Sequence, residues 1–363
     1  MDKKLIYMPT FRYRQQESYL LSSFDFGDNM YPLIEIVKEY DRLRKVQKPF
    51  EDIYIPAINK INAQHVFVDL PIYLKQSKSV KPEVNNFIIR IINNLETRCE
   101  YLNKLSKLSN KIIPVISSYF DKRKESNTIS IQTKLLRPNY PKLAFRIYMS
   151  SFDEDIIEIK KIIKPNDYII LDIDKAPPFV TRPLKSKYDQ LNEFKTITKI
   201  VLRSAINSDV ENVKLEHGKA ILEADNSHIE PHVYSALNVN AVGDYVGIKK
   251  DNLTEGGSIS PGFIYYDAIE NQFYGFKATI KDLKEFEDTI VPSVLKSKST
   301  KGMISAKPPY LSNNNLGYKT LLSISKGTES GKNQAKFKRI SMEHYIYCIK
   351  ILIENGMMKQ ENI

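Results

Sequence analysis

Five carboxylates lie at or just after short apolar runs, and they are the residues of this chain best suited to chemistry. Asp172 and Asp174 are two residues apart in YIILDID, so on a strand they would project from the same face. Carboxylates that converge can bind a hard cation, here Mg²⁺ or Mn²⁺ with Asp172 and Asp174 as ligands, or raise one another's pKa until one is a general acid. The candidate catalytic groups are therefore Glu35, Asp69, Asp172, Asp174 and Asp244, with Tyr245 as a further proton donor.

Arginines near the same positions could hold an anionic substrate. Arg12 and Arg14 share one face at the end of the first apolar run, and Arg203 ends the seventh. Arg146 lies within the fifth run. Guanidinium groups bind phosphate or carboxylate through paired hydrogen bonds. The sequence leaves open an alternative in which these arginines neutralise the carboxylates in a structural network, or the carboxylates cap helices.

Eight apolar runs predict the elements that would position these residues. Each run has six to eight residues rich in Ile, Val, Leu, Phe and Tyr, which suits a strand buried on both faces, and the intervals leave room for a helix. Eight such units predict an α/β fold, a (β/α)8 TIM-like barrel whose strands all end at one mouth. The runs cover residues 5–11, 31–37, 65–71, 112–118, 143–149, 168–174, 199–206 and 241–247.

Helices are expected between these runs. The longest should begin at Pro82 and continue through Leu105 with an apolar stripe, and a helix near residue 56 should be broken or opened by Pro56. His228 and His232 have the spacing of a zinc-binding helix, but Glu230 and Pro231 do not fit that motif. We therefore expect both histidines at the surface or at a helix start. Other helices are expected over 14–24, 150–163, 186–197 and 228–238.

Residues 248–340 are predicted to be an insertion between the eighth strand and its helix, within a single barrel domain of residues 1–363. Alternating apolar residues around AIEN predict a β-hairpin over 259–278, and a helix should follow over 281–297. The Ser-, Lys- and Asn-rich residues 298–335 predict a long mobile loop. A closing helix is predicted over 341–356, with Ser341 as its cap. Since the insertion leaves the carboxyl end of a strand, it should lie at the mouth.

The formal charge of +11 is concentrated in the insertion. Residues 291–340 hold ten Lys or Arg against one acid, Glu329. Such a cluster predicts attraction to nucleic acid or nucleotides, with Lys332, Lys336, Lys338 and Arg339 as candidate contacts. The alternative is a solvated lysine-rich face.

Two cysteines, Cys99 and Cys348, cannot make a four-ligand metal site and fit a reducing compartment. The apolar stretches are too short to cross a membrane, and the amino terminus lacks a signal-peptide core. We therefore expect a cytoplasmic protein that does not enter a membrane.

The chain contains the segments YMPTFRYRQQESYLLSSF, YPLIEIV, FVDLP, FRIYM, YIILDID, GDYVG, IYYDAIENQFYGFK and RISMEHYIY. Together these segments resemble the beta-protein family, which is named from a phage protein and is common in bacteria. The chain departs from the family at Arg14, Gln16 and Glu17, where a Lys and Gly-Glu are usual, and at Glu343, where a paired His is frequent. The resemblance implies a barrel of unsettled activity, with members in mobile elements and near phage-defence genes.

Two functions are consistent with these features, and whether the protein is an enzyme stays open. One is a phage-defence-associated hydrolase that acts on a phosphate-containing substrate, a nucleotide or nucleic acid, at the barrel mouth. The other is a non-catalytic binding or sensor component that recognises a phage or nucleic-acid ligand and signals to a partner effector. A divalent ion in the mouth would favour the first, and a mouth closed by Arg–carboxylate pairs would favour the second.

Overall fold

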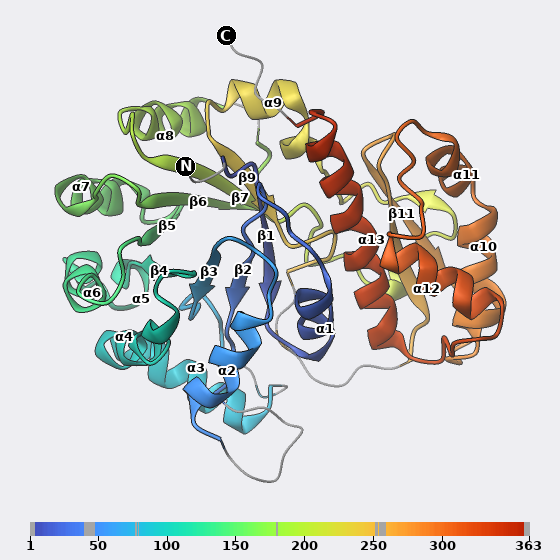
Figure 1. Ribbon diagram of the computed structural model, residues 1–363, viewed down its shortest axis with the longest axis horizontal. Helices are drawn as coiled ribbons and strands as arrows, with labels where there is room; N and C mark the ends of the chain where they lie inside the picture. The colour runs from blue at the N-terminus through green and yellow to red at the C-terminus, as the bar shows by residue number, and fades with distance from the viewer. Residues whose placement is uncertain are drawn as a thin grey trace.

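Eight parallel strands close into a barrel, with helices in the connections between them (Figure 1). The computed structural model describes residues 4–39, 48–76, 78, 80–178, 181–250, 253 and 259–358. Each predicted apolar run forms one barrel strand, so the predicted (β/α)8 barrel is confirmed. In barrel order the strands are β1 (Tyr7–Arg12), β2 (Leu33–Glu35), β3 (Val66–Asp69), β4 (Ile112–Ser117), β5 (Ala144–Tyr148), β6 (Tyr168–Asp174), β7 (Thr198–Arg203) and β9 (Ala241–Asp244).

The barrel strands alternate between a face that fills the interior and a face that packs under the helices. Met8, Leu33, Phe67, Ile170 and Ala241 belong to a separate buried cluster of strand residues inside the barrel. Because side chains alternate along a strand, residues an even number of positions away also point inward. Six candidate residues therefore belong to inward rows, whereas Arg203 and Asp244 belong to outward rows. Asp174 lies beyond an irregularity in the β6–β7 pairing, where this count stops. The inward six are Arg12, Glu35, Asp69, Arg146, Asp172 and Tyr245.

Short helices surround the barrel, and two predictions about them were wrong. The predicted long helix is interrupted at Asn94, which has an extended backbone and whose side chain accepts a 2.7 Å hydrogen bond from the Thr97 amide as a new cap. Pro56 lies inside a helix and does not break it. The helices are α1 (Gln15–Ser23), α2 (Phe50–Asn59), α3 (Pro82–Asn93), α4 (Leu95–Asn103), α5 (Phe120–Arg123), α6 (Thr128–Leu136), α7 (Phe152–Ile162), α8 (Arg182–Asn192) and α9 (Pro231–Ala236), with 3-10 turns η1 (Ser106–Leu108), η2 (Asn212–Lys214) and η3 (Ser227–Ile229).

The insertion contains the predicted β-hairpin, formed by β10 (Gly262–Asp267) and β11 (Gln272–Lys277). A third strand, β8 (Lys219–Ala220), pairs with β11 and comes from the connection after β7, which was not predicted. A π-helical turn, η4 (Phe286–Ile290), and α10 (Val291–Lys296) follow the hairpin. They cover the second half of the helix predicted over 281–297.

The loop predicted over 298–335 contains two helices, α11 (Lys298–Ser305) and α12 (Leu316–Ser325). Ser297 and Asn315 cap them, since their side chains accept hydrogen bonds from the Thr300 and Tyr318 amides. The loop prediction was wrong because each helix buries few residues, so its apolar periodicity is weak.

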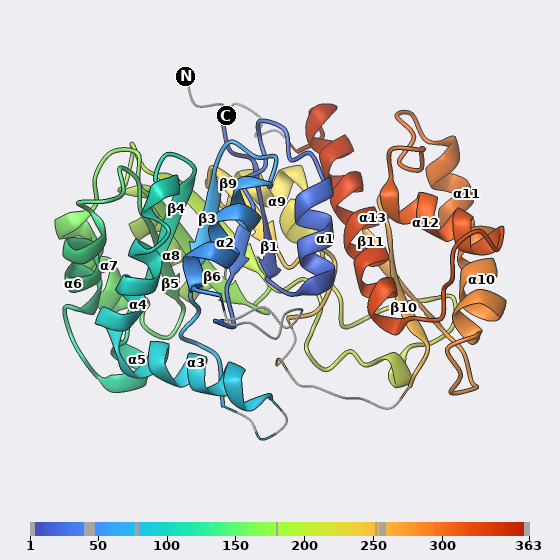
Figure 2. The same cartoon turned by 60° about the horizontal axis from the view of Figure 1, so that its bottom comes forward.

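The closing helix α13 (Gln334–Glu354) starts at Gln334, seven residues before the predicted Ser341. It lies between the barrel and the rest of the insertion (Figures 1 and 2). Among the described residues, we find no helix with the length and apolar character needed to cross a membrane.

Candidate functional site

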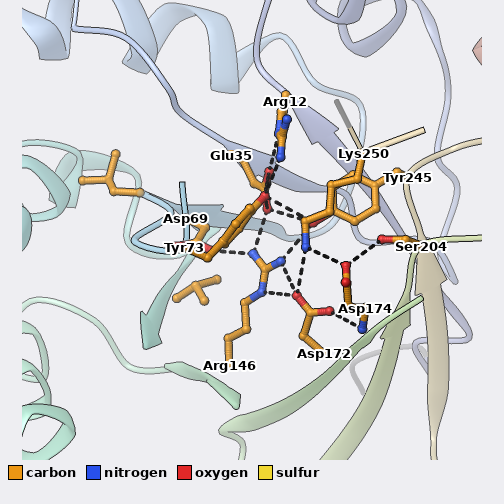
Figure 3. A network of polar contacts seen from close by, with 12 residues as sticks. Arg12, Glu35, Asp69, Tyr73, Arg146, Asp172, Asp174, Ser204, Tyr245 and Lys250 are labelled. Atoms are coloured by element: carbon orange, nitrogen blue, oxygen red, sulfur yellow. Dashed lines mark hydrogen bonds and ion pairs between the residues drawn. The ribbon is translucent and has the colours of Figure 1, made fainter. Parts of the chain in front are cut away.

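The Arg146 guanidinium is the centre of a buried polar network at the carboxyl end of the strands (Figure 3). Its Nη1 donates to Glu35 Oε1 at 2.8 Å and to Asp69 Oδ2 at 2.7 Å. Its Nη2 donates to Asp172 Oδ2 at 2.7 Å and to the Tyr245 hydroxyl at 3.0 Å. Pairing of β1 with β2 and of β2 with β3 places Arg12, Glu35 and Asp69 side by side. The barrel register thus brings four of the predicted site residues to one guanidinium.

Tyr73 and Arg12 complete the network on the side of Glu35. The Tyr73 hydroxyl donates to the Glu35 carboxylate, with oxygen distances of 2.7 and 2.8 Å. Arg12 donates from Nη2 to the Tyr73 hydroxyl at 3.0 Å and lies 3.3 Å from Glu35. Tyr148 stacks near Arg146, and its buried hydroxyl has no hydrogen-bond partner among the described residues. Neither tyrosine was predicted as a site residue.

Lys250 is the main functional residue that sequence reasoning missed. Its ammonium lies 3.7 Å from Asp172 Oδ2 and 3.4 Å from Asp174 Oδ1, over the Tyr73 ring. It comes six residues after β9 ends, so no strand pattern includes it. The available signal was the pair Lys249–Lys250 shortly after the eighth run.

Asp172 and Asp174 differ sharply in their surroundings. Asp172 is buried and accepts a 2.9 Å hydrogen bond from the Asp174 amide, while the Asp174 side chain is 62% exposed. Asp174 has a φ of 50° beside an irregularity in the β6–β7 pairing, a left-handed conformation uncommon outside glycine. The ammonium of Lys250 lies near both carboxylates, where a bridging cation would bind. Among the described residues, no three or more His, Cys, Asp or Glu side chains are grouped so as to hold a metal ion.

The charges of the network favour ionised groups. Burial opposes charging of Glu35, but Arg146 and Arg12 outweigh it and hold its pKa below the usual range. For Asp172, burial is outweighed by Lys250 and Arg146, so its pKa is also lowered. Burial opposes the charged ammonium of Lys250, yet Asp172 raises the pKa of this lysine above its ordinary value. Glu35 and Asp172 are therefore charged at neutral pH, and neither has the raised pKa of a general acid.

A second buried arginine holds Asp69 from behind the barrel wall. Arg98 on α4 donates to Asp69 Oδ1 at 2.8 Å and to the Leu70 and Val115 carbonyls at 2.8 and 2.7 Å. Among the described residues, the buried network contains four cations and three buried carboxylates, and the exposed Asp174 adds a fourth carboxylate beside Lys250. The cations are Arg12, Arg98, Arg146 and Lys250, and the buried carboxylates are Glu35, Asp69 and Asp172.

Asp244, which was grouped with the other carboxylates, lies in a separate cluster outside the barrel wall. Its oxygens accept hydrogen bonds from the Tyr7 hydroxyl at 2.8 Å and the Tyr345 hydroxyl at 2.6 Å. His228 Nε2 lies 3.0 Å from the same carboxylate. His228 is fully buried and lies in the 3-10 turn η3, so of its two predicted positions the surface one was wrong.

Two predicted arginines also lie apart from the network. Arg203 points outward to Asp225 at 2.7 Å and to the Ala176 carbonyl at 2.9 Å. Arg14 directly precedes α1 and does not line the cavity described next.

The mouth opens into a cavity of about 860 Å³. Arg12, Asp172, Asp174 and Lys250 line it together with Tyr73 and Tyr148. The connections after β3, β4 and β6 add exposed lysines, and these are Lys75, Lys122 on α5, and Lys175.

The four predicted nucleic-acid contacts on the insertion all have acidic partners. Lys336 lies 2.9 Å from Glu329 and Lys338 lies 2.6 Å from the buried Glu17. Lys332 and Arg339 lie 3.9 and 3.4 Å from Glu287 and Glu343. Much of the charge of these four residues is therefore balanced within the protein.

The fold and the site define a (β/α)8 barrel with a charge-paired network beneath an open mouth. The chain belongs to the Beta protein family, whose model matches residues 7–349. Among curated proteins, no match to the chain is found.

Proposed function

We propose that the barrel mouth binds a phosphate-bearing anion such as a nucleotide, and that the chain is a binding or sensor component that signals to a partner effector in phage defence. The observation that carries this proposal is that Arg12 and Lys250, two cations of the buried network, also line the cavity. Arginine and lysine groups in a partly desolvated site bind phosphate through charge-assisted hydrogen bonds.

The outer part of the cavity supports a ligand with more than one negative charge. Lys75, Lys122 and Lys175 come from three different β-to-α connections around the same cavity as Arg12 and Lys250. Several cations at two depths suit a nucleoside polyphosphate better than a single phosphate, because each phosphate would have its own cation.

The paired carboxylates favour binding over catalysis. Glu35, Asp69 and Asp172 all accept hydrogen bonds from Arg146, and the low pKa values of Glu35 and Asp172 leave them without a proton to donate. A network closed in this way fixes the positions of Arg12 and Tyr245 and favours a preorganised binding site.

Hydrolysis is the second candidate, and it is favoured by Asp174. This carboxylate is exposed in the cavity, has a left-handed backbone and lies beside Lys250. It could accept a proton from an attacking water. Mg²⁺ or Mn²⁺ at Asp172 and Asp174, in place of the Lys250 ammonium, would add stabilisation of phosphate charge.

Calorimetric titration with inorganic phosphate, pyrophosphate, AMP and ATP tests the proposal. We expect binding to wild type and a loss of about tenfold or more in Lys250→Met, because a charged hydrogen bond to the ligand disappears. Lys160→Met is the control, since it removes a lysine paired with Glu193 on the outer helix α7. Failure of all four ligands to bind at about millimolar concentration would overturn the proposal.

Phosphate release separates the two candidates. A sensor should leave ATP intact with or without Mg²⁺ or Mn²⁺. A hydrolase should release phosphate, and Asp174→Asn should abolish release while ligand binding persists.

A further inference from the structure

The turn after β9 has an unusual backbone next to the mouth. Val246 has a φ of 54° and Gly247 a φ of 66°, so two successive residues are left-handed. A β-branched residue rarely adopts this conformation, and it persists only where the surroundings hold it.

Asp244 and Tyr345 hold this turn in place. The Val246 amide donates to Asp244 Oδ1 at 2.7 Å, which closes the turn on the side chain two residues earlier. Tyr7, His228 and Tyr345 fix the same carboxylate from β1, η3 and α13. The Tyr345 ring also packs on Gly247 so closely that a Cβ there would lie 2.6 Å from Tyr345 Cγ.

The turn carries two residues of the mouth. Tyr245 points inward between Asp244 and Val246, where its hydroxyl accepts from Arg146 at 3.0 Å and donates to Glu35 at 3.2 Å. The Ile248 amide donates to the Tyr245 carbonyl at 3.2 Å, and Lys250 follows two residues later. The direction of the chain from β9 to Lys250 therefore depends on the conformation of Val246 and Gly247.

We propose that Asp244 is a positioning residue of the anion site, which it serves from the opposite face of β9. It holds the Val246–Gly247 turn, and the turn places Tyr245 and Lys250 in the mouth. The inference rests on the proposed function for its ligand, but the geometry of the turn is independent of that ligand.

The test compares two matched pairs of variants. Asp244→Asn and Tyr345→Phe weaken the contacts by which these two side chains hold the turn, here called the clamp. Asp267→Asn and Tyr266→Phe remove similar groups from the insertion. Asp267 is buried and accepts a 2.9 Å hydrogen bond from the Ile269 amide in the hairpin turn, and the Tyr266 hydroxyl donates to Asn271 at 2.9 Å. We expect the first pair to weaken phosphate or ATP binding by about fivefold or more, and the second pair to bind like wild type at a comparable loss of Tm.

A rescue experiment separates positioning from general destabilisation. Val246→Gly added to Asp244→Asn should restore part of the lost affinity, because glycine adopts the left-handed turn without the clamp. This rescue should occur even though glycine removes a buried side chain and lowers Tm.

Hydrogen exchange of residues 241–250, measured by mass spectrometry, makes the outcome independent of the ligand. Faster exchange in Asp244→Asn than in Asp267→Asn supports the inference even if wild type binds no phosphate compound, in which case only the proposed function fails. If Asp244→Asn binds phosphate or ATP as tightly as wild type does and its residues 241–250 exchange no faster, the inference is overturned and the proposed function is left intact.

Discussion

At the scale of single residues, Arg146 has the largest consequence for the barrel mouth. Its guanidinium is fully buried and is paired with Glu35, Asp69 and Asp172. Removing one partner of a buried ion pair is strongly destabilising because the remaining charge stays buried without compensation. Here a single substitution would leave three carboxylates short of their shared cation, although Arg12, Arg98 and Lys250 remain.

We expect Arg146→Met to lower the free energy of unfolding by about 3–5 kcal/mol at pH 7, with a changed dependence on pH. In wild type the lowered pKa values of Glu35 and Asp172 contribute stability above their unfolded pKa values, and this is lost as the pH falls through the folded ones. Without Arg146 the same carboxylates should take up protons more readily on folding. The difference in unfolding free energy between wild type and Arg146→Met should therefore shrink as the pH falls from 7 to 4. Urea unfolding across this range measures it.

Arg137→Met is the matched control for Arg146→Met. Arg137 makes a bidentate pair with Asp167, at 2.8 and 2.6 Å, and its side chain is 15% exposed. Because only one carboxylate loses its partner and water can reach the site, the loss should be smaller. The central role of Arg146 would be contradicted if both variants lost the same free energy of unfolding, or if the loss in Arg146→Met grew as the pH fell.

At the scale of elements, α13 joins the insertion to the barrel through adjacent residues. Burial lowers the pKa of His344 to about 4, so its ring is neutral and can donate from Nε2 to the Tyr266 carbonyl at 2.7 Å while accepting from Asn315. Tyr345 points instead to Asp244 of the barrel. One helix therefore contacts the hairpin with one residue and the β9 turn with the next.

Glu343 on α13 makes the stability of the protein depend on pH. Burial raises its pKa to about 7, against an ordinary value of 4.5, and Arg339 compensates only in part. A raised carboxyl pKa gives stability that is complete below about pH 4.5 and is lost as the pH rises through about 7. Glu343→Gln should therefore be more stable than wild type by about 1–3 kcal/mol at pH 8 and show no gain at pH 4.

Thermal unfolding at the two pH values measures the effect of Glu343→Gln. Glu354→Gln is the control on the same helix, since Glu354 is 55% exposed and pairs only loosely with Lys350 at 3.9 Å. A gain in Glu343→Gln that is the same at pH 4 and pH 8 would show that ionisation of Glu343 is not its cause.

The same elements show what the sequence could predict and why the rest was missed. Strands buried on both faces appear as continuous apolar runs, which located all eight barrel strands. Such runs do not distinguish the two faces of a strand by polarity. Because side chains alternate along a strand, however, Tyr245 lies on the same face as Ala241 and Asp244 lies on the opposite face, and this could have been predicted. Tyr73 and Lys250 come from loops, whose paths no periodicity encodes. Short helices such as α11 were missed because capping by Ser297 matters more there than apolar spacing.

At the scale of the whole molecule, the positive charge is less available than the sequence indicates. Lys332, Lys336, Lys338 and Arg339 pair with acids from η4, α1, α13 and the residues before α13. Five other lysines of the basic segment 291–340 are exposed, and no ion pair joins them to an acid within the part of the chain that the structure describes. They are Lys296, Lys301, Lys307, Lys319 and Lys326.

If the insertion binds nucleic acid, these five lysines should carry most of the salt-dependent affinity. Changing all five to Gln should reduce the slope of log affinity against log salt by about two to four units, since each neutralised phosphate contributes roughly 0.7–0.9. Changing Lys332, Lys336, Lys338 and Arg339 to Gln should alter the slope less and lower Tm more, because it breaks ion pairs. Fluorescence anisotropy with single- and double-stranded DNA and RNA measures the slopes.

The result that would reject an insertion interface is equally specific. Wild type that binds none of these nucleic acids at about 50 mM salt would assign the lysines to solubility. A larger loss of slope in the four-residue variant than in the five-residue variant would place the interface at the paired residues.

The clamp on the β9 turn cannot form until late in the synthesis of the chain. Asp244 and Tyr345 are 101 positions apart, and the ribosome makes Asp244 first. At roughly 5–20 residues per second, about 5–20 seconds separate the two residues during synthesis. Throughout this interval all eight strands have been made, yet the outward carboxylate of β9 lacks the Tyr345 hydroxyl and the turn lacks the ring that packs on Gly247. The nascent chain thus passes through a stage in which every barrel strand has been made but the contacts of Tyr345 with the β9 turn have not.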